Sequence, residues 1–153
     1  VGAALVVPAG LLARRKGQEE ALFSQDVHRR QRIEQIAMHT VIEHQQTQGY
    51  KLKDVSAEKC GWDISAYKEG HADRHIEVKG RAKGQSTITV TRNEIMYALN
   101  QEDKFWLAVV FVDEDDNADG PYYVQKPFKA EPDWGVASLN YDLDELLEKA
   151  DAL

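Results

Sequence analysis

The chain has 153 residues, of which 42% are hydrophobic and 29% are charged, and its formal net charge is −7. This length and composition indicate one globular domain that can bury a substantial core. The acidic balance argues against a tight, non-specific nucleic-acid binder acting alone, because such binding depends on Lys and Arg neutralising phosphates. A nuclease stays open, since its own carboxylates add to the total. Cys60 is the single cysteine, which excludes an internal disulfide and favours a cytoplasmic location.

The first residues are expected to lie outside the main domain. Residues 1–24 are interpreted as a linker or the end of a preceding domain, and residues 25–153 as the domain itself. Leu5–Val7 is a candidate short strand. The apolar start, Val1–Leu12, is too short to span a bilayer and lacks the basic residues that begin a signal peptide. Because the chain begins with Val, we expect a fragment of a longer protein.

A long helix is predicted over Asp26–Gln48, which is rich in helix formers and has no Gly or Pro. Glu34 is unusual there, because Ala37, Met38 and Val41 follow it at three, four and seven residues. The spacing predicts that the Glu34 carboxylate points toward the buried side of the helix. It would then either form a salt bridge with a buried partner or join a cluster of acids.

Two alternating segments, Gly61–Tyr67 and His75–Lys79, predict a β-hairpin. The polar segment between them contains Gly70, as a short loop should. If Gly70 is central, Asp63 lies opposite Glu77, and any even register keeps both acids on one face. The expected opposite face of the first strand carries Trp62, Ile64 and Ala66.

Facing carboxylates are an unusual way to stabilise a hairpin, because they repel each other. A divalent cation resolves the conflict, since two carboxylates, a backbone carbonyl and waters suit Mg²⁺. Lys79 follows Glu77 on the same face, where an ammonium could orient a water or offset charge on a phosphate. The plainer alternative is a structural domain whose acids form salt bridges.

A cationic row continues from the second strand. Arg81 and Lys83 alternate with Lys79, so they share its face if the strand continues. Such a row could bind a polyanion that runs past a metal site. The ordinary alternative is that these cations protect an edge strand from pairing with another chain. His75 flanks the hairpin and is a further candidate substrate contact.

The remaining elements predict an α/β fold, a mixed sheet of about four to five strands flanked by helices. A capping box, Thr91 to Glu94, opens one of the helices, and a continuous apolar run marks a strand covered on both faces. In chain order we expect a polar loop at Tyr50–Lys59, strands at Ser86–Val90, Lys104–Val112 and Tyr122–Gln125, and helices at Ile95–Asn100 and Tyr141–Lys149.

Asp63 followed by Glu77-Val78-Lys79 resembles the motif of the PD-(D/E)xK nuclease superfamily, which has the restriction-endonuclease-like fold. The segments IEQIAM, DVS, GWDIS, IEVKG and TRNE, in this order, more closely resemble the domain named after the plant protein NO VEIN. That domain is often found at the C-terminal end of large helicase-like proteins. The resemblance covers about Glu34 to Val112.

The resemblance implies a role for each matching residue. Asp63 and Glu77 would bind Mg²⁺ or Mn²⁺, with the carbonyl of Val78 as a third ligand. Lys79 would position the attacking water. Glu34 would be the helix acid of the superfamily, and Glu94 falls where related nucleases sometimes place an extra polar residue.

We therefore expect a metal-dependent nuclease, cutting or nicking DNA in the service of an upstream helicase region of the same polypeptide. No membrane partner is expected, and restriction-type enzymes often form homodimers. The rival hypothesis is a non-catalytic module of nuclease fold that binds nucleic acid or docks a partner. A nuclease of this type requires the three acids and Lys79 to converge on one cation-sized spot.

Overall fold

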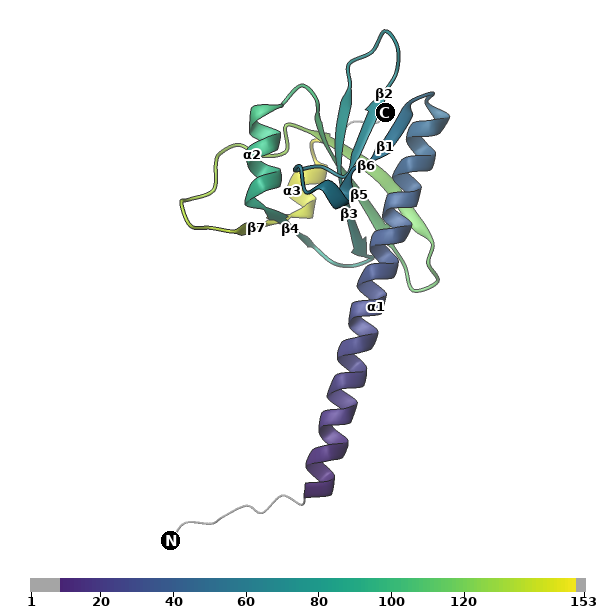
Figure 1. Cartoon of the computed structure of the whole chain (residues 1–153), viewed down its shortest axis with the longest axis vertical. Helices are drawn as coiled ribbons and strands as arrows, with labels where there is room; N and C mark the ends of the chain where they lie inside the picture. The colour runs from purple at the N-terminus through teal and green to yellow at the C-terminus, as the bar shows by residue number, and fades with distance from the viewer. Residues whose placement is uncertain (1–8, 151–153) are drawn as a thin grey trace. The chain divides into compact units, whose positions relative to one another are not determined.

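The computed structural model describes residues 9–150, and the chain divides into two units between Arg32 and Ile33. Helix α1 spans this division, and the sheets lie in the second unit (Figure 1). Among the described residues, every helix is too short or too polar to cross a membrane. The elements are α1 (Ala9–Thr47), β1 (Lys51–Asp54), a 3-10 turn (Ser56–Glu58), β2 (Ile64–Tyr67), β3 (Arg74–Ala82), β4 (Thr87–Thr91), α2 (Arg92–Asn100), β5 (Phe105–Val112), β6 (Ala118–Gln125), β7 (Ser138–Asp142) and α3 (Leu143–Leu147).

The main sheet has five strands in the order β1-β2-β3-β5-β6, which confirms the predicted α/β class. Strands β3 and β5 are parallel, and the other neighbouring pairs are antiparallel. The predicted hairpin is present as β2 and β3. Its pairs Ile64↔Ile76 and Ser65↔His75 belong to the register that places Asp63 opposite Glu77.

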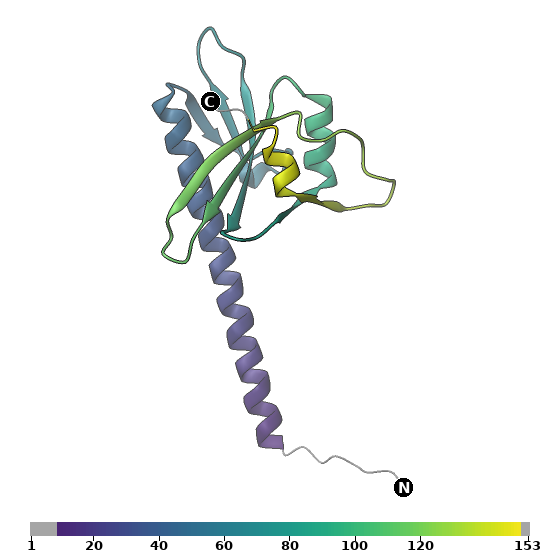
Figure 2. The same ribbon diagram turned by 180° about the vertical axis from the view of Figure 1, so that it is seen from behind.

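Each face of this sheet is covered by a separate core. On one face, Ile33, Ala37 and Val41 of α1 pack with residues such as Ile76 and Val110. On the other, α2, α3 and the two-stranded sheet of β4 and β7 pack on β5 (Figure 2). Strand β5 is therefore buried on both sides, as its apolar run predicts.

Gly80 fixes which face of β3 meets α1. A Cβ atom built there would lie 2.9 Å from both the Ala37 Cβ and the Ile33 carbonyl oxygen. Only a residue without a side chain lets helix and strand approach so closely. Because successive strand residues point to opposite faces, Glu77 and Lys79 face away from α1.

Several element predictions were wrong. Helix α1 begins at Ala9 rather than at the predicted Asp26, because residues 9–25 are also mostly good helix formers. The candidate strand Leu5–Val7 lies outside the described residues. The polar loop at Tyr50–Lys59 contains β1, whose Lys-rich sequence suits an exposed edge. Strand β7 was missed, and α3 covers only the middle of the predicted final helix.

Candidate active site on strand β3

Asp63 is held at the entrance to β2 by backbone and side-chain bonds. Its N–H donates to the carbonyl of Ile76 at 2.9 Å, and its own carbonyl accepts the N–H of Val55 at 2.8 Å. The carboxylate accepts the N–H of Val78 at 2.9 Å. Burial raises the pKa of Asp63, while the bond from Val78 and the nearby charge of Lys79 oppose that rise. The side chain is thus fixed beside β3 rather than free in solvent.

Glu77 is the most buried acid of the site, with 4% of the residue exposed. Burial raises its pKa to about 8, from an ordinary value of 4.5. The neighbouring carboxylates Asp63 and Glu94 raise the pKa further, and Lys79 lowers it. A carboxyl group that is this hard to ionise gains strongly from any added positive charge.

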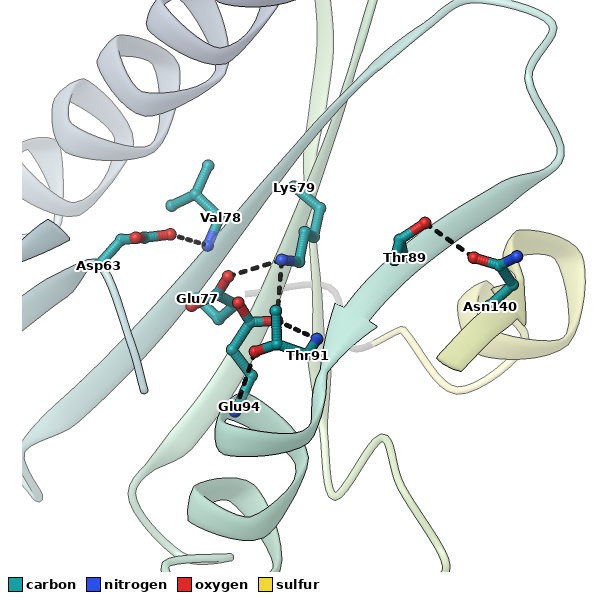
Figure 3. Close-up of polar contacts among 8 residues, drawn as sticks. All are labelled: Asp63, Glu77, Val78, Lys79, Thr89, Thr91, Glu94 and Asn140. Carbon is teal, nitrogen blue, oxygen red and sulfur yellow. Dashed lines mark hydrogen bonds and ion pairs between the residues drawn. The ribbon is translucent and has the colours of Figure 1, made fainter. Parts of the chain in front are cut away.

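Lys79 lies between two acids from different elements (Figure 3). Its Nζ is 2.8 Å from Oε1 of Glu77 and 2.9 Å from Oε2 of Glu94. Burial alone would lower the pKa of Lys79, but the two carboxylates raise it on balance. The two acids together therefore favour the charged form of Lys79.

Glu94 owes its position to the predicted capping box at the start of α2. The Thr91 N–H donates to Oε2 of Glu94 at 2.9 Å, and the Glu94 N–H donates to the Thr91 hydroxyl at 3.4 Å. The sequence predicted this box from Thr91 and Glu94. The structure shows that its carboxylate caps the helix and also binds Lys79.

A cavity of about 350 Å³ opens over these acids. Asp63, Glu77 and Glu94 all line it, so three carboxyl groups share one opening. The acids therefore stay accessible to a small ion or to a phosphate, although Glu77 is almost fully buried. The remaining lining residues are Ser56, Lys59, Gly61, Trp62, Thr91 and Asn93.

The donor set fits a hard cation that needs few protein ligands. Among residues 9–150, no group of three or more His, Cys, Asp or Glu residues is placed so that it could hold a metal ion. Mg²⁺ is usually bound by one or two carboxylates, with waters and substrate phosphates completing its shell. Asp63 and Glu77 can supply such a pair from one wall of the cavity. A Zn²⁺ site would instead require His or Cys ligands.

Glu34 does not join this cluster, and the prediction that it points inward was wrong. The residue is exposed. Its helix packs against the Gly80 side of β3, whereas Glu77 and Lys79 occupy the other side. The neighbours of Glu34 at three, four and seven residues misled the prediction. The buried face is centred instead on Ile33, Ala37 and Val41.

The three candidate substrate contacts are spread along the sheet. Strand β3 continues to Ala82, so Arg81 shares the face of Lys79, and its Nε is buried without a hydrogen-bond partner among the described residues. Lys83 is exposed just after the strand, and its N–H donates to the Val112 carbonyl. His75 lies two residues before Glu77 on β3 and does not line the acid cavity.

An aromatic stack that the sequence did not reveal borders the acids. The rings of Trp62 and His75 are parallel, with centroids 4.5 Å apart, and Tyr97 of α2 stacks on Trp62 at 4.3 Å. The Tyr97 hydroxyl also bonds to Nδ1 of His75. Trp62 was expected on the face opposite Asp63, but the chain turns at Gly61, whose φ is 103°, and the indole N–H donates to the Ser65 hydroxyl at 2.9 Å.

The fold and site together define an α/β domain with a buried acid–lysine cluster around strand β3 of its main sheet. A family profile described as "Protein NO VEIN, C-terminal" matches residues 33–124, more than half of the chain. The chain therefore belongs to the NO VEIN C-terminal family. The match starts at the first residue of the second unit and ends within β6. Comparisons with curated proteins and with solved structures give no match.

Proposed function

We propose that the domain is a metal-dependent nuclease that hydrolyses phosphodiester bonds in DNA. The observation that carries this proposal is Glu77, a nearly buried acid with a raised pKa, placed beside Asp63 and Lys79 under an open cavity. Perturbed carboxyl groups in a cleft are typical of catalytic sites. A domain stabilised only by packing has no need of such a group, because burying it costs free energy.

Each residue has a role that its position supports. Asp63 and Glu77 would hold Mg²⁺ or Mn²⁺, with the Val78 carbonyl as a third ligand. The bound ion would lower the pKa of a water and stabilise charge on the phosphate. Lys79 would orient the attacking water, and Glu94, 2.9 Å from its Nζ, would hold the ammonium in place.

The sequence around these residues supports the same proposal. The IEVKG segment, which lies on β3, and Asp63, which directly precedes β2, resemble the PD-(D/E)xK motif. Arg81 extends the same face beyond Lys79 and would meet the phosphates that flank the cut site, with Lys83 following. In a longer polypeptide, an upstream helicase region would deliver the DNA strand.

Plasmid cleavage tests the proposal. Supercoiled DNA is incubated with the chain and Mg²⁺ or Mn²⁺, and nicked and linear products are measured against a reaction in EDTA. Cleavage should require the metal and should be lost in Glu77→Gln and in Lys79→Ala. The matched control is Glu114→Gln, which changes an exposed acid in the turn between β5 and β6. Cleavage that survives Glu77→Gln would refute the assignment.

Metal binding gives a second readout that does not depend on turnover. Titration calorimetry with Mn²⁺ should show one site in the original chain, and binding should be lost in the Asp63→Asn, Glu77→Gln double variant. The Glu114→Gln protein should bind Mn²⁺ like the original chain. Equal binding by the double variant would place the ion elsewhere.

Two observations favour the non-catalytic alternative. Glu34 is exposed on a helix that packs on the other side of the sheet, so the three predicted acids and Lys79 do not converge on one spot, as a nuclease of this type was expected to require. Lys79 already pairs with both Glu77 and Glu94, so each of these carboxyl groups has a cationic partner without a metal. Under this alternative the domain binds nucleic acid without cutting it. DNA binding in EDTA, with no Mn²⁺ site in calorimetry and no metal-dependent cleavage, would be the result that distinguishes it.

A further inference from the structure

Strands β1 and β2 extend the acid-bearing face of the sheet toward its edge, where the side chains are basic and aromatic instead of acidic. The register pairs Lys51 with Tyr67 across β1 and β2, and pairs Lys53 with Ser65. Ser65 is in turn opposite His75 of β3. Paired residues share a face, and alternate strand residues return to it, so this row lies on the same face as Glu77 and Lys79.

A second open cavity of about 270 Å³ lies over this row. Tyr67 is 54% exposed, which is unusual for a large aromatic side chain that has no cover. Both lysines are exposed as well. We call this cavity the edge groove, and its polar and aromatic lining residues are Lys51, Lys53, Ser65, Tyr67, Asp73 and His75.

The edge groove and the acid cavity meet at the aromatic stack. His75 lines the edge groove, and Trp62 lines the acid cavity. The two rings are stacked with an angle of 6° between them, so one wall separates the two openings. A flexible chain that crosses this wall passes directly from the lysines to Asp63 and Glu77.

The charge of the edge groove suits an anion. Lys51 forms no ion pair with any residue in the described part of the chain, and Lys53 is bound only to Glu58, at 2.9 Å between two exposed side chains. Exposed pairs of this kind contribute little stability, so Lys53 can exchange Glu58 for a phosphate. Lys104 adds a cation near His75, and Asp73 is the one acid of the lining.

We propose that the edge groove binds a single strand of nucleic acid and leads it to the acid cavity. Lys51 and Lys53 contact successive phosphates, and a base stacks on Tyr67. Unpaired bases are required because a duplex hides their faces, whereas stacking on an aromatic ring tolerates any base. This inference rests on the proposed nuclease function and narrows its substrate to a strand that is single-stranded beside the cut site.

Oligonucleotide binding in EDTA tests the edge groove separately from cleavage. Fluorescently labelled oligothymidylate and oligouridylate are titrated with the 153-residue chain, alongside a blunt duplex of the same length. Tyr67→Ala should weaken single-strand binding by about fivefold or more. Lys51→Ala should reduce the slope of log affinity against log salt by about 0.7, the value for one lost phosphate contact on a single strand.

Matched variants on other elements serve as controls. Tyr122→Ala removes a partly exposed tyrosine from β6, and Lys129→Ala removes an exposed lysine after that strand. Both should bind the oligonucleotides like the original chain. Thermal unfolding of every variant shows that the fold is retained, and Tyr67→Phe should keep most of the affinity because the ring is preserved.

The outcomes separate this inference from the proposed function. Binding that is unchanged in Lys51→Ala and Tyr67→Ala, or that is as tight for the blunt duplex, would overturn the edge groove. The proposed nuclease function would still stand in that case if plasmid cleavage depended on the metal. Single-strand binding that depends on Lys51 and Tyr67, without any cleavage, would support the groove and refute the nuclease. A chain that binds none of the three probes would also overturn the groove.

Discussion

Lys79 Nζ lies 2.9 Å from Oε2 of Glu94, and the same oxygen accepts the backbone N–H of Thr91 at 2.9 Å. One carboxylate thus caps α2 and neutralises the lysine of β3. Because the two partners come from separate elements, this contact fixes the start of α2 against the middle of the sheet. The site and the packing of α2 are therefore coupled, and the variants below measure that coupling.

Replacing Lys79 should destabilise the protein strongly. Lys79→Met would leave Glu77 and Glu94 close together and largely buried without a cation, and breaking a buried ion pair typically costs about 3–5 kcal/mol. Urea unfolding at pH 8 measures the change. Lys126→Met is the matched control, because Lys126 pairs with Glu102 at 3.4 Å between exposed side chains, and such a pair contributes at most about 1 kcal/mol.

Adding Glu77→Gln to Lys79→Met should recover part of the lost stability. The double variant removes one of the two uncompensated carboxylates and keeps the side-chain size. Unfolding of the single and double variants under the same conditions measures the recovery. If the double variant were less stable than Lys79→Met alone, repulsion between the acids would not explain the loss.

Glu94→Ala should cost more stability than Thr91→Ala. Each change removes half of the capping box, and loss of a cap costs about 0.5–2 kcal/mol. Glu94→Ala also removes a partner of Lys79, so its effect should be the larger one. A double-mutant cycle between Lys79 and Glu94 should give a coupling of about 1 kcal/mol or more. Additive effects would show that the contact contributes nothing measurable.

The raised pKa of Glu77 predicts a specific pH dependence. Between pH 4.5 and about 8, folded Glu77 keeps a proton that the unfolded chain has released. The folded state then binds more protons, so the free energy of unfolding should fall as pH rises through this window. For one group, the free energy of unfolding changes by at most about 1.4 kcal/mol per pH unit. The stability that protonated Glu77 contributes is fully present below the window and is lost as pH rises to about 8.

Urea unfolding in EDTA from pH 5 to pH 8 measures this dependence. Glu77→Gln cannot lose a proton, so its stability should vary less with pH than that of the original chain. Glu114→Gln should leave the dependence unchanged, because Glu114 is exposed. A Glu77→Gln profile parallel to that of the original chain would mean that Glu77 does not titrate in this window.

Much of the site could be predicted because it depends on short-range patterns. Alternation predicted that Asp63 and Glu77 share a face, and the observed strand register is the one in which Gly70 is central. Glu34 could not be placed in this way. Its position depends on which side of the sheet α1 covers, and that is decided by a contact between Gly80 and Ala37, 43 positions apart. Spacing along one helix carries no information about such a contact.

The missed elements have a related cause. Strand β1 is short and polar because it lies at the sheet edge, so nothing in its composition separates it from a loop. The stack of Trp62, His75 and Tyr97 joins residues from three parts of the chain. An aromatic residue shows in a sequence that it can stack, but its partner is set by tertiary structure.

Gly80→Ala should destabilise the domain by about 1–3 kcal/mol, because overpacking forces backbone shifts. The added Cβ would lie 2.9 Å from the Ile33 carbonyl oxygen, which cannot rotate away as a side chain would. Gly17→Ala is the matched control, since a Cβ there meets nothing within 4 Å, and alanine is the better helix former. Equal stability of the Gly80→Ala protein would mean that α1 can move away from β3.

On strand β3, the residues that stabilise the fold alternate with the residues of the polar cluster, so the two can be changed separately. Ile76, Val78 and Gly80 carry the packing against α1, and Glu77 and Lys79, between them, carry the polar cluster. Under the proposed nuclease function, a size-matched change such as Glu77→Gln should therefore abolish cleavage in a cell while the level of the protein stays normal. A phenotype of such an allele could then be attributed to the lost activity rather than to loss of the protein.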